Sequence, residues 1–533
     1  MTIETSDTTS KATLRAAANG VSAHLIWQVT ARVASFAIKA IVIRALGPAQ
    51  FAFVEIRLGL LVSLALLPAI GAFRKVCLRV PDERTAASLA YLCSFVTVVV
   101  SVLLGTIAFY NDSINAASWA VVTASLVIRA FGEPPLVFAR RRERYYQSSR
   151  ARAVSTMVSG IGQALVVSFV SDPRWAKPAS ASGHVFYSAS LGIAMYFATG
   201  PQRIPLLSFG EVRAFLRWED IRMTGVVLGQ SLLKFILENG EGIILDVTCP
   251  ATVKGAYKLA GNFASIMARF FSEALEEQSF NVFHRLAPAF RNSKQLLNTD
   301  QTGREEEMRS TCLSTLSMAL KAAIGISVLI AFVGPAYSYS ILRLLYGEDW
   351  ADRTSAPALL NSYFVYLVFM AANGVSEAFV SASASTEELK LQTKFTTLLS
   401  ICYVAALYVA ALRFQATGII LVNCVNMALR TAYSAWYFQK LTGRSSLEFF
   451  RSALLHPGVI VSLFVTSRIS KMSEKFFISG EPSFWSGVKM SLYERIALHS
   501  FSGLFAVTVF AWSVIKFESS FISQMRSLRS HQD

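Results

Sequence analysis

The sequence has few charged side chains for its length. Lysine, arginine, aspartate and glutamate make up 16% of its 533 residues, whereas soluble domains average about a quarter. Hydrophobic residues make up 53% of the chain, and the mean hydropathy is +0.45. This shortage of charge argues against a soluble protein and predicts an all-α polytopic membrane protein.

The motifs of several enzyme classes are also absent. The chain has no GxxxxGK[ST] phosphate loop, no HExxH and no Ser-centred nucleophile elbow. Its six histidines are dispersed, and its six cysteines show no CxxC or paired spacing, so the cysteines are expected to be small core residues. We therefore expect no enzyme activity, no cofactor and no metal site.

A cleavable signal peptide is absent as well. Residues 1–20 are polar and lack an apolar core, so the first membrane span is expected to be the targeting signal. The net charge of +16 fits basic cytosolic loops and contacts with anionic lipid head groups. It does not require a nucleic-acid partner.

Apolar runs long enough to cross a bilayer predict about fourteen transmembrane helices. They group into two six-helix bundles followed by two trailing helices. The expected spans are 21–45, 50–79, 84–110, 114–138, 150–171, 182–200, 222–247, 252–286, 309–333, 356–382, 389–412, 416–440, 447–468 and 496–517.

The charges of the connecting loops predict the orientation. Arginines crowd the loop after the fourth span, whereas residues 111–115 contain no basic side chain. By the positive-inside rule, the even-numbered loops and both termini are then cytosolic. The predicted organisation is a cytosolic N-terminus (1–20), a first six-helix bundle (21–201), a cytosolic linker (202–221), a second six-helix bundle (222–440), two C-terminal helices with a luminal interfacial segment (441–517) and a cytosolic tail (518–533).

The first span carries a polar stripe. His24, Gln28, Arg32, Ser35 and Lys39 recur at helical spacing and share one face. A charge at mid-membrane costs about 2.5–3.5 kcal/mol even on lenient insertion scales. Two basic residues on one stripe therefore predict a polar cavity beside this helix.

Other expected spans also carry polar residues at helical spacing. The seventh span has a comparable stripe, which weakly suggests an internal repeat of the kind that many transporters use. The second span and its ends are basic, and the carboxylates lie mostly in the second half of the chain. The residues expected to form or line the cavity are Lys39, Lys75, Arg129, Lys234, Glu238, Glu241, Glu276, Glu277, Asn423 and Arg430.

A basic cavity suits an anionic substrate. Arginine suits phosphate in particular, because its planar guanidinium contacts two oxygens at once. Some of the charged residues could instead pair with each other along one helix, as Arg269 with Glu273 or Lys234 with Glu238 could. In the fourth span, Arg129 and Glu133 lie one turn apart. Pro134 and Pro135, which follow, predict a kink or an end of that helix.

Several short blocks resemble the eukaryotic Rft family. In the first half they are Gln28-Val29 with Arg32, Ile43-Arg44, Ile56-Arg57-Leu58 and Ala72-Phe73-Arg74-Lys75-Val76-Cys77-Leu78. In the second half they include Gly255-Ala256-Tyr257, Asn262, Ala268-Arg269, Glu276-Glu277, Asn373-Gly374-Val375-Ser376-Glu377 and Asn423-Cys424-Val425-Asn426-Met427. The resemblance is weakest over 80–220 and after 440.

The resemblance implies the fold of the multidrug/oligosaccharidyl-lipid/polysaccharide exporter superfamily. It also implies a function: helping a diphosphodolichol-linked heptasaccharide of N-glycosylation reach the luminal leaflet of the endoplasmic-reticulum membrane. The implied partners are this dolichyl diphosphate oligosaccharide, membrane lipids and enzymes of N-glycan assembly. The residues expected to bind substrate are Gln28, Arg32, Arg44, Arg57, Arg74, Asn262, Arg269, Asn373 and Glu377.

Other functions stay open at this point. A non-flipping accessory protein could hold the same lipid, or hold the assembly enzymes together. A cation-coupled drug exporter of the same superfamily fits the carboxylates but not the basic first bundle. A glycosyltransferase would need an acidic luminal loop, which the sequence does not supply.

Overall fold

The structure is a computed structural model of the full chain. It describes residues 36–111, 114–142, 144–170, 172–199, 207–268, 299–478 and 490–519, with a few further positions between 275 and 283 and position 523. In these residues the chain is helical and contains no strand, which confirms the predicted all-α class. The chain divides into two compact units, Met1–Ile236 and Leu237–Asp533.

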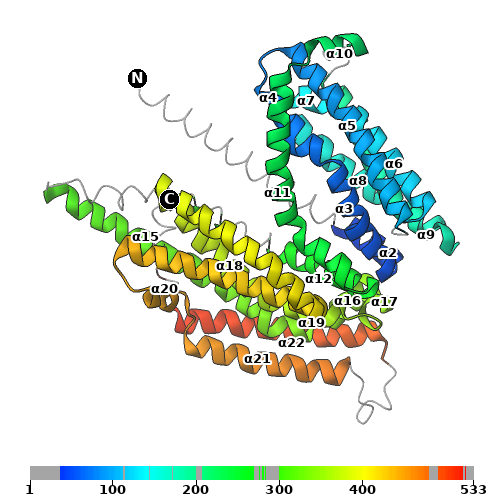
Figure 1. The fold of residues 1–533 in the computed structure, drawn as a ribbon. Helices are drawn as coiled ribbons and strands as arrows, with labels where there is room; N and C mark the ends of the chain where they lie inside the picture. The colour runs from blue at the N-terminus through cyan, green and yellow to red at the C-terminus, as the bar shows by residue number, and fades with distance from the viewer. Residues whose placement is uncertain are drawn as a thin grey trace, which may run out of the picture. The chain divides into compact units, whose positions relative to one another are not determined.

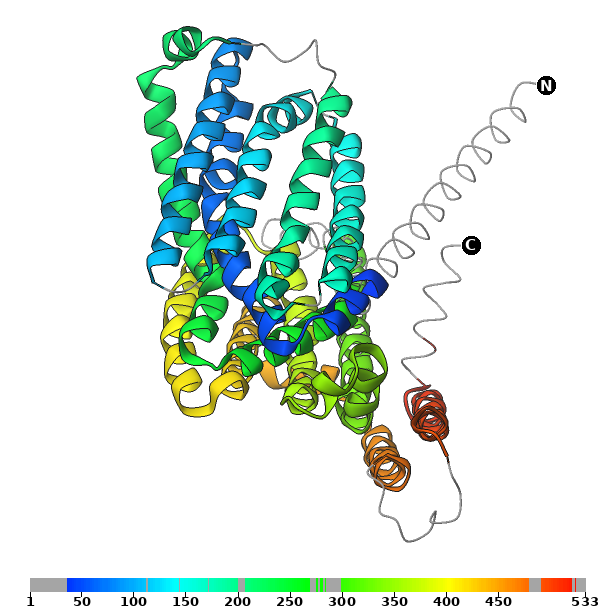
Figure 2. The same cartoon turned by 90° about the vertical axis from the view of Figure 1, so that its right-hand side faces the viewer.

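The first unit is built from long helices and one broken helix. Residues 36–45 form the end of the first expected span. Helix α5 packs against α6, α6 against α9, and α9 against α8, and these helices stand side by side in Figure 2. Their bounds are α5 Glu83–Tyr110, α6 Ala116–Phe131, α7 Glu133–Arg141, α8 Tyr145–Phe169 and α9 Pro173–Thr199.

The second expected span is a helix with two wider turns. It comprises α2 (Pro48–Ala52), the π-helical η1 (Phe53–Leu58), α3 (Gly59–Ala65), the π-helical η2 (Pro68–Phe73) and α4 (Arg74–Arg79). Such π segments are rare and occur often at functional sites. They lie in the stretch that contains Arg57 and end directly before Arg74.

The predicted kink in the fourth span is confirmed. Helix α6 ends at Phe131, Gly132 forms a turn, and α7 begins at Glu133 with Pro134 in its first turn. Proline fits there because a first-turn residue needs no intrahelical N–H partner. The break places Arg129 and Glu133 on either side of the turn.

A short helix and a long helix follow. Helix α10 (Phe209–Phe215) begins with a capping box, in which Ser208 and Glu211 exchange hydrogen bonds. The backbone N–H and hydroxyl of Ser208 hold the pKa of the Glu211 carboxyl below its usual value. Helix α11 (Trp218–Thr248) crosses the division between the two units.

The second unit is a second set of packed helices (Figure 1). Its largest core cluster is built by α15, α18, α19 and α20, with Phe379 and Tyr437 among the fully buried side chains. The bounds are α12 Ala251–Ala268, α15 Thr299–Val333, η6 Gly334–Ala336, α16 Ser338–Tyr346, α17 Glu348–Ala351, α18 Ala356–Ser383, α19 Thr386–Thr442, α20 Ser446–Ala453, α21 Pro457–Phe477 and α22 Leu492–Phe517.

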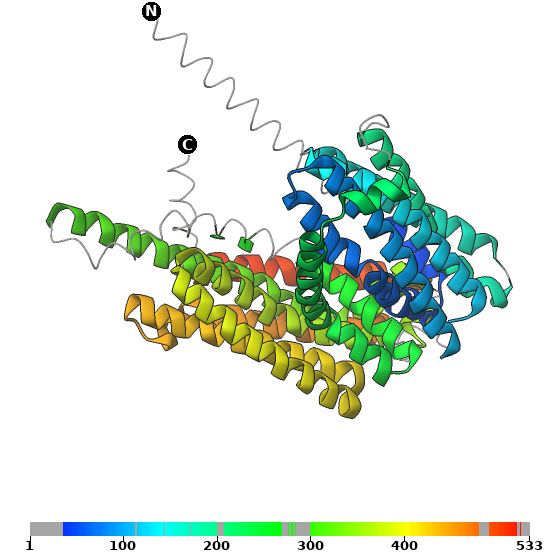
Figure 3. The ribbon, with the colours of Figure 1, turned by 45° about the horizontal axis from the view of Figure 1, so that its top comes forward.

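Helix α19 is a hairpin with two antiparallel limbs. Its backbone leaves helical geometry at Gln415, where φ is 50° and ψ is −137°. Side chains equally far from this turn meet: Lys440 Nζ lies 2.9 Å from Glu388 Oε1, and Phe395 stacks on Tyr433 at 4.7 Å. The two limbs lie alongside each other in Figure 3, and they correspond to the expected spans 389–412 and 416–440.

The expected span 447–468 is wrong in its limits. The structure has a short helix α20, a break at residues 454–456, and then α21 from Pro457 to Phe477. Pro457 explains the break, since proline is favoured in the first turn of a helix and disfavoured inside one. The luminal interfacial segment is expected over residues 471–495, and its first part, 471–477, belongs to α21.

The two trailing helices are held against α15 and η6. Helices α21 and α22 run side by side (Figure 1). The ring of the fully buried His499 stacks on Tyr337 at 4.3 Å and lies 2.9 Å from both Ser473 Oγ and the carbonyl oxygen of Ala336. At the other end, Lys321 Nζ is 2.8 Å from Glu518 Oε2.

Seven helices in the described part of the chain are long and apolar enough to cross a membrane. One of them is the α19 hairpin, whose limbs were expected as separate spans. The count of fourteen spans and the domain limits 21–201, 202–221, 222–440 and 441–517 stay predictions.

Candidate functional site

The first unit contains a buried cluster of two arginines and one carboxylate. Arg74 is 4% exposed and Glu133 is fully buried. Arg74 donates from Nε to Glu133 Oε2 at 2.8 Å and from Nη2 to Oε1 at 2.6 Å. This two-pronged contact joins α4 to α7. It satisfies a carboxylate that would be very costly to bury alone.

Arg129 gives this cluster a surplus of positive charge. Its Nε lies 3.5 Å from Glu133 Oε1, and its guanidinium lies 5.5 Å from the centre of the Tyr187 ring. Arg129 is 8% exposed, and its Nε and Nη1 have no hydrogen-bond partner in the described part of the chain. Two guanidinium groups therefore share one carboxylate inside the first unit.

The remaining basic candidates of the first unit are nearer its surface. Arg44 and Lys39 are exposed on the helix over 36–45, and Arg57 is half-buried in η1. Lys75 is exposed, and its Nζ donates to Ser231 Oγ at 3.4 Å.

In the second unit, Glu241 accepts hydrogen bonds from α12 and from both limbs of α19. The hydroxyl of Tyr257 in α12 donates to Oε1. Asn423 Nδ2 and the Tyr403 hydroxyl, from the two limbs of α19, lie 3.1 Å and 3.5 Å from Oε2. Tyr403 also donates to Asn423 Oδ1 at 2.6 Å. The structure thus joins two predicted cavity residues, Glu241 and Asn423, directly, and Tyr403 contacts both of them.

A second polar cluster lies between α18 and α19. Arg430 Nη2 donates to Glu377 Oε1 at 2.9 Å, and Asn373 Nδ2 donates to Glu377 Oε2 at 3.1 Å. These side chains line a small cavity of about 10 Å³, which is room for about one water molecule. Asn373 Oδ1 is buried without a hydrogen-bond partner among the described residues.

The carboxylate of Glu276 occupies the space beside Gly374. A Cβ atom added to Gly374 would lie 1.6 Å from Glu276 Oε1. Only glycine leaves room for this approach, directly beside Asn373 in the chain. Glu276 is therefore placed against the turn of α18 that carries Asn373 and Glu377.

The other candidates are less informative. Asn262 is half-buried in α12, and its Nδ2 has no hydrogen-bond partner in the described ranges. Lys234 and Glu238 are exposed on α11. Gln28, Arg32, Arg269 and Glu277 lie outside the described residues. Among the described residues no group of three or more histidine, cysteine or carboxylate side chains could hold a metal ion.

Sequence reasoning missed the partners of these residues. Glu133 was noted only as lying one turn from Arg129, and neither its ion pair with Arg129 nor its closer contact with Arg74 was predicted. Tyr257 and Tyr403 were not expected to contact Glu241. A tyrosine in an apolar helix looks like an ordinary core residue, so only the block Gly255-Ala256-Tyr257 marked one of them.

Comparison with solved structures gives the fold. The structure matches the solved structure titled "Lipid II flippase MurJ, inward closed conformation" with a TM-score of 0.57 at 10% sequence identity. The match covers 92% of this chain and 99% of that one. The chain therefore shares the fold of this solved structure.

Comparison with protein families decides the family. The model of the Rft protein family matches residues 16–528. The chain belongs to the Rft family. Its curated relatives are named as translocation proteins, which agrees with the expectation that the chain is not an enzyme.

Relatives of this Rft chain come from several eukaryotes. A protein of Xenopus tropicalis named "Man(5)GlcNAc(2)-PP-dolichol translocation protein RFT1" is 28% identical over 487 residues, which are 84% of this chain and 87% of that protein. A protein of the same name from Schizosaccharomyces pombe is 25% identical over 79% of this chain and 82% of its own length.

Proposed function

We propose that this Rft chain binds a dolichyl diphosphate-linked, mannose-rich oligosaccharide and helps it reach the luminal leaflet of the endoplasmic-reticulum membrane. The observation that carries this proposal is the Rft family match over residues 16–528, together with relatives that are named for translocating Man(5)GlcNAc(2)-PP-dolichol. A fold shared with a solved lipid flippase is consistent with a lipid substrate.

The diphosphate is assigned to arginines. Arg32, Arg44, Arg57, Arg74 and Arg269 are proposed to neutralise it, because guanidinium groups contact phosphate oxygens in pairs. Arg44 is exposed and Arg57 half-buried, so both are accessible. Arg74 already has a carboxylate partner, and a diphosphate there would have to compete with Glu133.

The sugars are assigned to amides and a carboxylate. Gln28, Asn262, Asn373 and Glu377 are proposed to form hydrogen bonds with sugar hydroxyls. Asn262 Nδ2 and Asn373 Oδ1 both have unused hydrogen-bonding capacity in the described structure, which supports this role. The dolichol tail would stay in the bilayer, where its apolar surface is already removed from water.

The proposed placement is a multi-pass protein of the endoplasmic-reticulum membrane with both termini in the cytosol. The arginine-rich loop after α7 supports the orientation through the positive-inside rule. The proposed partners are the dolichyl diphosphate oligosaccharide and the surrounding lipids, and enzymes of N-glycan assembly.

The decisive experiment reconstitutes the purified protein in liposomes that contain the lipid-linked oligosaccharide. We expect the protein to retain the lipid and to accelerate its movement between leaflets, relative to protein-free liposomes. Retention without acceleration would identify an accessory protein that holds the lipid. Neither retention nor acceleration would contradict the proposal.

A further inference from the structure

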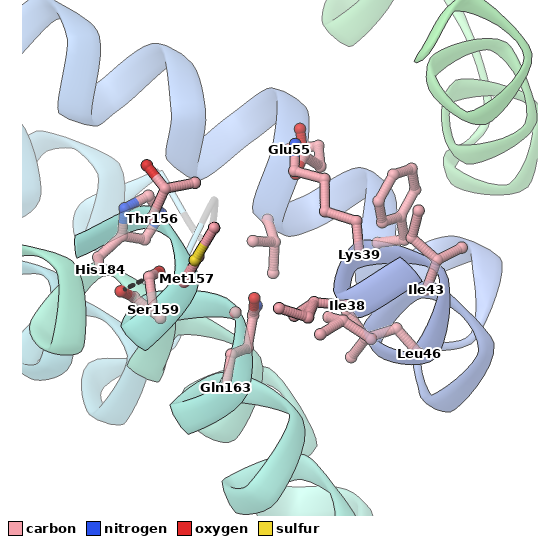
Figure 4. A pocket seen from close by; sticks show the side chains of 15 residues that line it. Ile38, Lys39, Ile43, Leu46, Glu55, Thr156, Met157, Ser159, Gln163 and His184 are labelled. Carbon is pink, nitrogen blue, oxygen red and sulfur yellow. Dashed lines mark hydrogen bonds between the residues drawn. The ribbon is translucent and has the colours of Figure 1, made fainter. Parts of the chain in front are cut away.

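The first unit encloses a cavity that none of the clusters above uses. It has a volume of about 160 Å³ and lies between the helix over 36–45, the broken helix that follows, α8 and α9 (Figure 4). All of its lining residues belong to the first unit. Its walls are partly apolar, with Ile43, Leu46 and Met157 among them.

Four polar side chains from different elements line this cavity. They are Lys39 from the helix over 36–45, Glu55 from η1, Gln163 from α8 and His184 from α9. Figure 4 shows Lys39 with the apolar side chains of its helix on one side, and His184 on the opposite side. The cavity is therefore polar at several points around its wall.

These side chains have hydrogen-bonding capacity that the described protein does not use. Lys39 and Glu55 take part in no ion pair in the described structure, and His184 Nε2 is buried without a hydrogen-bond partner there. Gln163 uses its Nε2 to donate to the carbonyl oxygen of Ser180 at 2.5 Å. Buried polar groups normally find partners, but His184 Nε2 lacks one among the described residues, whereas Lys39 is exposed and Glu55 is half-buried, which leaves both open to a polar ligand.

The cavity has the size of one six-membered ring. An engineered protein cavity of about 150 Å³ holds one benzene molecule. Its narrow shape depends on Gly160, where an added Cβ would lie 2.6 Å from Ile38 Cγ2. Glycine there lets α8 approach the helix over 36–45 closely.

We propose that this cavity binds one hexose ring, with Lys39, Glu55, Gln163 and His184 as its hydrogen-bonding residues. A sugar hydroxyl both donates and accepts, so one ring can satisfy an ammonium that only donates and a carboxylate that only accepts. The less polar ring faces then contact the aliphatic wall. An alkyl chain would offer no hydrogen-bonding partner to Lys39, Glu55 or His184, and an anion that paired with Lys39 would leave the Glu55 carboxylate without a donor. The inference rests on the proposed function for its source of hexose, the lipid-linked glycan.

The test uses thiol protection in the full-length protein. Cys402 is the exposed native cysteine and is replaced by Cys402→Ser; Thr156→Cys then places one reactive thiol on the cavity wall. The protein is held in phosphatidylcholine nanodiscs. We expect methyl mannoside to slow modification of this thiol by a small thiol reagent, about tenfold at about ten times its Kd, because only the empty cavity reacts. Cyclohexanol, a ring without the array of hydroxyls, should not protect.

Matched variants test whether the protection by methyl mannoside arises from binding in this cavity. Arg174→Cys puts a thiol at the exposed start of α9, outside the expected span 182–200 and away from the cavity lining, and it should react without protection. Glu55→Gln, Lys39→Met and His184→Phe should each abolish protection by the mannoside while the unprotected labelling rate stays unchanged.

Three outcomes would overturn the hexose site. Equal protection by cyclohexanol would indicate an apolar site, protection by dolichyl phosphate would indicate a lipid-chain site, and no protection by any ligand would indicate a cavity filled by water only. Retention of the radiolabelled lipid-linked oligosaccharide is measured separately on the same protein. Retention without mannoside protection contradicts the hexose site alone, whereas protection without retention contradicts the proposed function alone.

Discussion

The guanidinium of Arg74 and the carboxylate of Glu133, 59 positions apart in the chain, form a two-pronged buried ion pair of 2.6 Å and 2.8 Å. Arg74 is therefore a structural residue of the first unit, whatever else it contacts. Any experiment on Arg74 has to separate loss of fold from loss of ligand.

Replacing only one member of this ion pair should destabilise the protein more than replacing both. Arg74→Met leaves the Glu133 charge without its closest partner, which should lower the free energy of unfolding by about 3–5 kcal/mol. The double variant Arg74→Met/Glu133→Leu should recover much of this loss, measured as the thermal unfolding midpoint. If the double variant is stable but no longer retains the lipid-linked oligosaccharide, Arg74 contacts the ligand as well. Additive destabilisation would contradict the structural pairing.

Gly374→Ala should displace the Glu276 carboxylate. The new Cβ would lie 1.6 Å from Glu276 Oε1, so the carboxylate has to leave the turn of Asn373 and Glu377. We expect a lower unfolding midpoint and weaker ligand retention. Gly229→Ala is the matched control: it lies in helix α11 with no atom within 4 Å of the added Cβ, and should be neutral or stabilising by up to about 1 kcal/mol.

The contact between Gly374 and Glu276 also predicts that the stability losses of variants at these two positions are not additive. In the Glu276→Ala variant the clashing carboxylate is gone. Adding Gly374→Ala to it should therefore lower the unfolding midpoint only slightly further. If the unfolding midpoint of the double variant falls by the sum of the two single losses, glycine is required at position 374 for a reason other than the space for Glu276.

Tyr257→Phe should weaken the support of Glu241. It removes a hydroxyl that donates to this carboxylate, and hydrogen bonds to charged groups contribute about 1.5–3 kcal/mol. Tyr366→Phe is the control, because the Tyr366 hydroxyl makes no hydrogen bond in the described part of the chain. Equal changes in unfolding midpoint for the two variants would contradict the assigned donor.

Gln415→Gly should stabilise the protein. The φ of 50° at this position is unfavourable for a residue with a Cβ, at a cost of about 1–3 kcal/mol, and glycine adopts it freely. We expect a higher unfolding midpoint for Gln415→Gly and no gain for Gln415→Ala. A lower midpoint for the glycine variant would show that the side chain of Gln415 matters more than its backbone.

Single cysteines should report the orientation. A thiol at Arg142, at the end of α7, should be labelled from the cytosol, and one at Asn111, at the end of α5, from the lumen. Labelling of intact and permeabilised microsomes with a membrane-impermeant reagent distinguishes the two sides. The reverse pattern would overturn the predicted orientation and the sidedness of the proposed site.

Helices with strong apolar patterns were predictable from local sequence. So were contacts one turn apart: the Asn373–Glu377 hydrogen bond joins residues whose spacing places them on one face. The break before Glu133 followed from two prolines. Pro457 carried the same signal for the break before α21, where it was not used.

Contacts between helices were not predictable from one sequence. Arg430 lies 53 positions from Glu377, and Asn423 lies 182 positions from Glu241, so nothing in local spacing pairs them. The π segments were also hidden, because an extra residue in a turn leaves no mark on an almost uniformly apolar run. The cavity residues Glu55, Gln163 and His184 come from three separate helices and share no pattern.

The hairpin of α19 has a consequence for biogenesis. Its limbs are joined at Gln415 without a loop, so almost no hydrophilic chain has to cross the bilayer when they insert. Their charged ends, Glu388 and Lys440, are paired, and in the predicted orientation both would lie on the cytosolic side. We expect the two limbs to leave the translocon together as one unit, with their topology set by these ends and not by the charge of a connecting loop.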